Sequence, residues 1–156
     1  MVHRGIATIA SALVVCFLLL SRFDGQFFLF HFYESLIYLA IVLMLFYFED
    51  RWAYMMGMVA PAIWLALTVA WSGLPGISQQ LLIAMQPSRP FFPTALLTMT
   101  AVILSFVMIV ECAIHWYREF AGLKKGWPTL LISLSVAAAY YALLVVWLLR
   151  WPPAVG

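Results

Sequence analysis

Hydrophobic residues occur along this chain in five long runs, separated by shorter polar segments. Each run approaches or exceeds the roughly 20 residues that a helix needs to cross the ~30 Å hydrocarbon core of a bilayer. Each is expected to be helical, because backbone amides inside a membrane need internal partners. The predicted helices cover residues 5–20, 27–48, 52–71, 94–116 and 127–149. The pattern therefore predicts an all-α integral membrane protein, a bundle of five transmembrane helices forming one domain over residues 1–156.

Tryptophan residues mark the ends of two of these runs. Trp52 and Trp71 are 19 residues apart, and Trp127 and Trp147 are 20 apart. At the ~1.5 Å rise per residue of a helix, each pair spans about 30 Å, the thickness of the hydrocarbon core. Indole rings favour the interface between lipid and water. The spacing thus supports two of the crossings independently of hydropathy.

Two local features concern the third predicted helix. The linker 49–51 is so short that the second and third helices are expected to form an antiparallel hairpin. Pro61 lies in the middle of the third helix and lacks the N–H that would bond to the carbonyl of Gly57. A kink is therefore expected at Pro61.

The longest connection covers residues 72–93. The segment 72–76 contains two glycines and a proline and is expected to end the third helix. Pro87, Pro90 and Pro93 are expected to keep the approach to the fourth helix extended. A short interfacial helix is expected between them on the outer surface. Its apolar face would hold Ile77, Leu81, Leu82 and Met85, opposite Ser78, Gln79 and Gln80.

Composition agrees with a membrane protein and restricts the function. Hydrophobic residues make up 67% of the chain, charged residues 9%, and the mean hydropathy is +1.06. No segment remains to build a soluble catalytic domain, so an enzyme is disfavoured. The net charge of +2 is too small for nucleic-acid binding. Cys16 and Cys112 lie in apolar runs and are expected to pack as small hydrophobic side chains.

Loop charges suggest an orientation. Five cationic residues fall on the side of the N-terminus and three on the opposite side. The positive-inside rule then places the N-terminus in the cytoplasm and the C-terminus outside. Asparagine is absent and arginine outnumbers lysine six to two, biases that suit a high-GC bacterial genome. The expected location is therefore a bacterial cytoplasmic (inner) membrane.

Polar residues within the runs are the candidates for function, because ionisable groups in hydrocarbon are costly. Glu34 lies about 10 Å below the outer interface, counted from Phe27 at the helical rise. His31 and Tyr38 share its helix face at spacings of three and four residues. The same depth on the other helices is reached by Trp64, Thr98, Thr100, Tyr140 and Tyr141.

Two interpretations of this intramembrane polar cluster stay open. Glu34 could be an uncharged packing residue bonded to Tyr38 or Trp64, because loss of water favours the neutral acid. It could instead be a proton- or cation-binding carboxylate, with His31 as a relay to the outer surface. A metal site is disfavoured, since one His and one Glu supply two ligands.

Glu111 and His115 form a second pair, four residues apart, at the cytoplasmic end of the fourth helix. A single haem held by both His31 and His115 is excluded, because the predicted topology puts the two imidazoles about 20 Å or more apart. A haem or chlorophyll on one histidine remains open. No metal or other cofactor is expected.

The function expected first is that of an accessory or assembly subunit of a larger membrane complex, without catalytic residues. Its partners would be the lipid bilayer and other membrane-protein subunits. The alternative is a small transporter or proton-conducting protein that uses Glu34. A haem- or chlorophyll-binding subunit is third. No local motif identifies a reaction or a family.

Overall fold

The computed structural model describes residues 3–47, 50–86, 92–120, 122 and 126–150, and these residues are almost wholly helical. Five of the helices in this part of the chain are long and apolar enough to cross a membrane, which confirms the predicted all-α class and the five long apolar helices. Their bounds are α1 His3–Phe23, α2 Phe28–Tyr47, α3 Asp50–Ala84, α4 Phe92–Phe120 and α5 Gly126–Arg150. A short 3-10 helix, Gly25–Phe27, joins α1 to α2.

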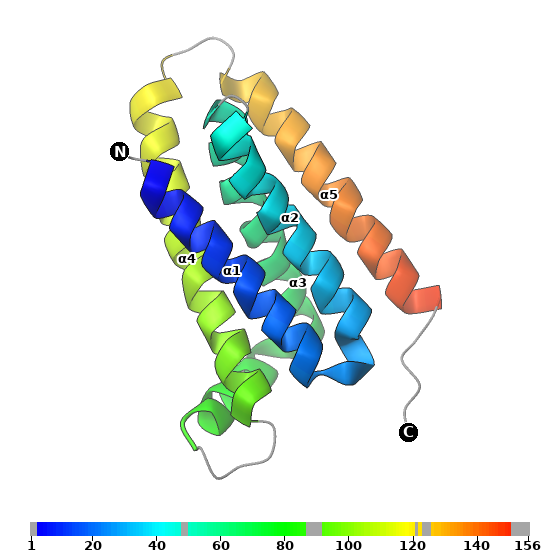
Figure 1. Ribbon diagram of the computed structural model, residues 1–156. Coiled ribbons are helices and arrows are strands. Elements are labelled where there is room, and N and C mark those ends of the chain that lie inside the picture. The colour runs from blue at the N-terminus through cyan, green and yellow to red at the C-terminus, as the bar shows by residue number, and fades with distance from the viewer. Residues whose placement is uncertain (1–2, 48–49, 87–91, 121, 123–125, 151–156) are drawn as a thin grey trace.

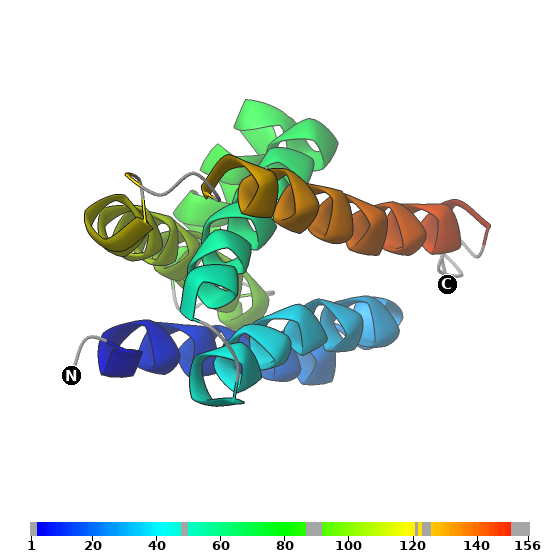
Figure 2. The same cartoon turned by 90° about the horizontal axis from the view of Figure 1, so that it is seen from above.

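The helices run alternately in opposite directions along the bundle (Figure 1). One end, called here the Asp24 end, holds the end of α1 and the starts of α2 and α4. The other, the Trp52 end, holds the start of α3, the end of α4 and the start of α5. Seen from above, α1 and α2 form one layer, and α3, α4 and α5 the other (Figure 2). The most extensive contact is between α3 and α4, and α5 packs chiefly on α3.

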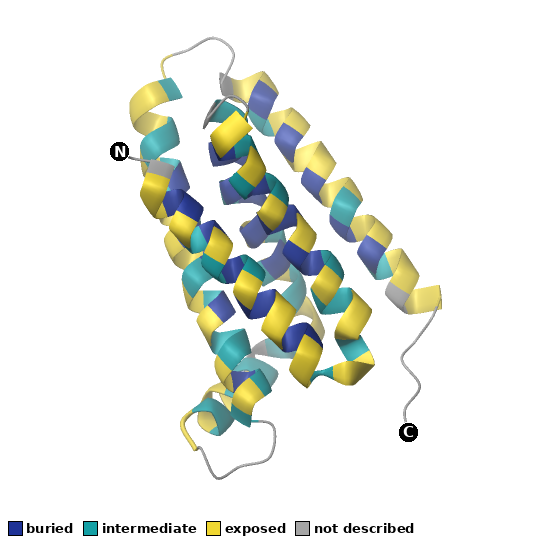
Figure 3. Ribbon diagram, viewed as in Figure 1, coloured by how far each residue is buried: buried dark blue, intermediate teal, exposed yellow. Residues whose placement is uncertain are grey.

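Burial follows the helical repeat. In α1 the buried residues recur every three or four positions, as they must to share one face of a helix. They are Ile6, Ala7, Ala10, Leu13, Cys16, Phe17, Leu20 and Ser21. The remaining surface of each helix is largely exposed and apolar (Figure 3). This distribution is the one expected where hydrocarbon, and not water, surrounds the bundle.

Exposed aromatic rings lie at both ends of the bundle. Tyr47, Tyr117 and Trp127 are exposed at the Trp52 end, and Trp71 is exposed toward the Asp24 end. Rings at these two levels fit the two interfaces of a membrane. Both cysteines are free and buried, as expected of small hydrophobic side chains.

The break in α3 falls at Gly73, where the backbone has φ 64° and ψ 170°. Positive φ is accessible to glycine because it has no Cβ. Around Pro61 the torsions stay helical, and the residue of α3 with non-helical torsions, Gly73, lies twelve residues later. The predicted break in 72–76 is confirmed, and the chain after it resumes a helix to Ala84.

Other local expectations change in detail. Asp50 and Arg51 belong to α3, so this helix begins inside the expected linker. Pro93 lies in the first turn of α4 and not in an extended segment, because the missing N–H of proline has no cost there. Pro87 and Pro90 lie outside the described residues.

Candidate functional site

Glu34 is the buried carboxyl group at the centre of the candidate site, and its side chain is 2% exposed. It lies on α2, two turns from the Asp24 end. The indole Nε1 of Trp64 on α3 donates a hydrogen bond of 2.8 Å to Glu34 Oε1. His31 Nδ1 lies 3.0 Å from the other oxygen, Oε2, in hydrogen-bonding contact. Both carboxyl oxygens are thus bonded within the bundle, as buried polar groups require.

His31 connects this carboxyl to the Asp24 end. Its second ring nitrogen, Nε2, lies 3.8 Å from Asp24 Oδ2. Side-chain exposure falls in order from 34% at Asp24 to 17% at His31 and 2% at Glu34. The three groups therefore form a line from the Asp24 end into the interior of the bundle, with an imidazole in the middle.

Local helix geometry and ring packing position these groups. His31 and Glu34 are three residues apart on α2, a spacing that brings two side chains to the same face. Trp64 is held by Phe17 of α1, whose ring packs edge to face against the indole at 5.3 Å between centroids. The same phenylalanine stacks on Tyr38, also at 5.3 Å. Residues from three helices thus fix the indole that bonds to Glu34.

Three hydroxyl groups lie further into the bundle than Glu34. Tyr38 and Ser105 are fully buried and Tyr141 is 2% exposed. The hydroxyl of Tyr38 interacts with those of Ser105 and Tyr141. The carboxyl oxygens of Glu34 bond to Trp64 and His31, so of the two partners expected for Glu34 the structure provides Trp64 and not Tyr38. The ring of Tyr38 stacks on Phe17.

Tyr140 belongs to a separate contact. Its hydroxyl donates to the backbone carbonyl of Tyr33, and the two rings stack at 4.3 Å between centroids. Thr98 and Thr100 donate to carbonyls of their own helix, those of Thr94 and Leu96. These residues were expected near Glu34 because they lie at the same depth in the membrane as Glu34. Depth does not determine which way a side chain points around its helix axis, and these three residues do not bond to Glu34.

Asp24 and Ser105 were missed at the sequence level. Asp24 precedes His31 by seven residues, which is about two helical turns. This spacing would have placed the two side chains on one face if the segment before α2 had been expected to be helical. Ser105 carries no such signal, since its position beside Tyr38 depends on how α4 packs against α1 and α3.

The second expected pair lies at the Trp52 end. His115 Nε2 and Glu111 Oε2 are 3.5 Å apart on α4, and the Glu111 side chain is 47% exposed. The imidazole stacks on Tyr54 of α3 at 5.9 Å between centroids. These residues lie at the opposite end of the bundle from His31 (Figure 1). The two histidines therefore do not face a common space.

Metal and haem ligation can be assessed from the same geometry. Asp24 and Glu34 contact opposite nitrogens of His31, so the three groups do not converge on one point. Among the described residues no group of three or more His, Cys, Asp or Glu side chains could hold a metal ion. An axial bond from His31 to a haem iron would require one of the two carboxylates to move away.

Comparison with protein-family models, with curated proteins and with solved structures finds no match to this chain. Its function must therefore be inferred from its own side chains and their contacts.

Proposed function

We propose that this chain is a small, non-catalytic membrane protein that binds and releases a proton at Glu34, and that it acts as a proton-conducting or proton-coupled transporter. The observation that carries the proposal is the line of Asp24, His31 and Glu34, in which exposure falls stepwise toward the carboxyl. A carboxyl that served packing alone would need Trp64 but would not need an imidazole leading to the protein surface.

The proton moves along this line in two steps. Glu34 holds the proton on Oε2 and donates it to His31 Nδ1. The imidazole then releases the proton on its other nitrogen, Nε2, toward Asp24, and the ring changes tautomer. His31 Nε2 and Asp24 Oδ2 are 3.8 Å apart, which is too far for a direct hydrogen bond. In this proposal a water molecule carries the proton between them. One proton leaves Glu34 and one reaches the Asp24 end, and uptake reverses the steps.

An apolar layer separates Glu34 from the Trp52 end. Ile41, Met108, Cys112 and Ala137 are completely buried in this part of the core. The buried hydroxyls of Tyr38, Ser105 and Tyr141 lie on the Glu34 side of these four residues, and the contact of Glu34 with His31 supports proton entry from the Asp24 end. Transport across the whole membrane then requires a second conformation in which the layer opens, as in alternating access.

The orientation belongs to the same proposal. The five-to-three excess of cationic residues on the side of the N-terminus supports a cytoplasmic Trp52 end and an external Asp24 end. The proposed location is a bacterial cytoplasmic membrane. Glu34 would then exchange its proton with the external medium.

Proton flux into proteoliposomes loaded with a pH-sensitive dye tests this function. Glu34→Gln keeps the shape of the side chain but cannot release a proton, so the flux should fall at least tenfold. Asp24→Asn should slow the flux without abolishing it. Glu111→Gln is the matched control, because it removes a half-exposed carboxyl at the other end and should leave the flux unchanged.

Two results would contradict the proposal. One is a wild-type flux no greater than that of empty liposomes, and the other is an equal flux in Glu34→Gln. Infrared spectroscopy checks the starting state independently. We expect a protonated carboxyl band at neutral pH that is absent from Glu34→Gln.

An accessory subunit of a larger complex is the second candidate function. The observation in its favour is a continuous exposed stripe on α4, formed by Ile103, Phe106, Val110 and Ile114. Such a stripe could pack against the helices of another subunit. Purification in mild detergent, with measurement of mass, co-purifying chains and visible spectrum, distinguishes this role from a pigment-binding subunit. A colourless monomer without companions would contradict both.

A further inference from the structure

Two neighbouring tyrosines attach α5 to α2 at the level of Glu34. Tyr140 donates its hydroxyl hydrogen to the backbone carbonyl of Tyr33, and the two rings stack at 4.3 Å between centroids. The next residue, Tyr141, is buried in the core, where its hydroxyl interacts with that of Tyr38. Tyr33 and Tyr38 lie on either side of Glu34 in the sequence of α2. The attachment of α5 to α2 is therefore made next to the proposed proton-binding carboxyl.

The bond made by Tyr140 involves the turn of α2 that carries Glu34. In an α-helix the carbonyl of Tyr33 accepts a hydrogen bond from the N–H of Ile37, four residues later. The Tyr140 hydroxyl contacts both groups, because it donates to the Tyr33 carbonyl and also meets the Ile37 N–H. A side chain that enters the hydrogen-bond ladder of a helix is one of the causes of helix bending. A change in the position of α5 would therefore alter the backbone turn from which Glu34 reaches His31.

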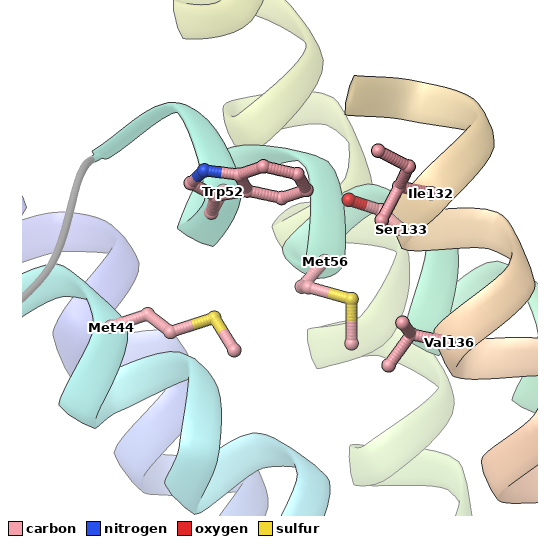
Figure 4. Close-up of a pocket in the computed structure, with 6 residues that line it drawn as sticks. All are labelled: Met44, Trp52, Met56, Ile132, Ser133 and Val136. Carbon is pink, nitrogen blue, oxygen red and sulfur yellow. The ribbon is translucent and has the colours of Figure 1, made fainter. Parts of the chain in front are cut away.

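Away from the tyrosines, α5 packs on α3 and makes few contacts with α2. Toward the Trp52 end a groove of about 180 Å³ separates α5 from α2, beside Ser133 (Figure 4). Met44 of α2 faces Met56 of α3 and Val136 of α5 across this groove. Val136 precedes Tyr140 by four residues, which is about 6 Å along a helix, so the groove ends one helical turn from the tyrosine contact. Few contacts other than those of the tyrosines would break if α5 moved away from α2.

We propose that Tyr140 is a positioning residue that keeps Glu34 directed toward the Asp24 end, and that the second conformation forms when α5 separates from α2. The inference rests on the proposed proton transport, which requires such a conformation. While Tyr140 bonds to Tyr33, the turn of α2 holds Glu34 against His31, and Ala137 of α5 completes the apolar layer. When this bond breaks, Ala137 leaves the layer together with α5, and the carboxyl becomes accessible from the Trp52 end.

Removal of one hydroxyl tests the role of the contact. Tyr140→Phe keeps the stacked ring but cannot donate to Tyr33, so the second conformation should become more populated. Proton flux in proteoliposomes should then rise about threefold, the shift that corresponds to a typical interhelical hydrogen bond in a membrane. A tyrosine that served packing alone would give an equal or lower flux. Tyr47→Phe, which removes an exposed hydroxyl at the end of α2, is the matched control and should keep the wild-type flux. Tyr140→Phe/Glu34→Gln should lose the flux, because the proton still passes through the carboxyl.

Crosslinking tests the movement of α5. Tyr33→Cys/Tyr140→Cys, joined by a short thiol-bridging reagent that a reductant releases, should lose most of its proton flux and regain it on reduction. Each single cysteine variant is the control and should not respond to the reagent, and Cys16 and Cys112 are buried. While the link is intact, the infrared carboxyl band of Glu34 should still respond to pH at the Asp24 end.

Two results would overturn this inference. One is a flux in Tyr140→Phe that equals or falls below that of the wild type, and the other is an unchanged flux after crosslinking. Either result could occur while wild-type flux still depends on Glu34, so the proposed function would stand without the role of Tyr140. A wild-type flux no greater than that of empty liposomes would instead overturn the proposed function itself, and this inference with it.

Discussion

Gly57 and Cys112 bring α3 and α4 to a close approach in the core of the bundle. A Cβ atom at position 57 would lie 2.5 Å from the Cys112 sulfur and 3.2 Å from the terminal methyl group of Met108. Both Cys112 and Met108 are fully buried, so either side chain could move only by displacing its neighbours in the core. The absence of a side chain at Gly57 therefore permits the most extensive helix contact of the fold.

Gly57→Ala is expected to destabilise the bundle by roughly 1–3 kcal/mol, the usual cost of overpacking a core. Unfolding in detergent, followed by circular dichroism, measures the loss. Gly5→Ala is the control, since nothing lies within 4 Å of the added Cβ there. In the double variant Gly57→Ala/Cys112→Ala, removal of the sulfur leaves a 3.6 Å contact with the Cβ of residue 112 and the 3.2 Å approach to the Met108 methyl group, and it should recover part of the stability. A double variant less stable than Gly57→Ala alone would contradict this explanation.

Removal of the Glu34 carboxyl is expected to weaken the bundle modestly. Glu34→Ala and Trp64→Phe each break the 2.8 Å hydrogen bond and should cost on the order of 1 kcal/mol, as interhelical hydrogen bonds in membranes do. Glu34→Gln should stay near the wild type, because its amide oxygen still accepts from Trp64. The same unfolding measurement applies, with Glu111→Ala as the control. Wild-type stability in Glu34→Ala would show that the bond contributes nothing to folding.

Gly73→Ala is expected to disturb α3 more than Pro61→Ala. The torsions at Gly73 lie in a region that is essentially restricted to glycine, and a side chain there costs about 1–3 kcal/mol. Pro61 already has helical torsions, so alanine would restore a backbone donor without strain. Thermal unfolding of the two variants in one detergent compares them. Equal stability of the two would show that the break at Gly73 relaxes without cost.

Cysteine labelling in intact cells tests the orientation. Ser78→Cys, which is exposed after the break in α3, should react with a membrane-impermeant maleimide. Gly122→Cys, at the Trp52 end, should react after the membrane is permeabilised. Background labelling should be low because Cys16 and Cys112 are buried. Labelling of Gly122→Cys from outside would reverse the orientation and expose Glu34 to the cytoplasm.

The hydropathy of the chain is enough to determine five helices and their approximate ends. Crossing a bilayer requires about 20 apolar residues and full internal hydrogen bonding, and both conditions are local to each segment. The break in 72–76 was predictable for the same reason, since glycine and proline act on their own backbone. The kink at Pro61 stays a prediction, because a proline can bend the axis of a helix while its own torsions remain helical.

The pairing of His31 with Glu34 and of Glu111 with His115 also follows from sequence spacing, because residues three or four apart share a helix face. Contacts between helices depend on the rotation of each helix about its axis and on which helices are neighbours. Depth along the chain does not contain this information. The tertiary structure therefore decided that Trp64, and not Tyr38, bonds to Glu34, that Tyr140 bonds to Tyr33, and that α2, α3 and α5 enclose a groove beside Ser133.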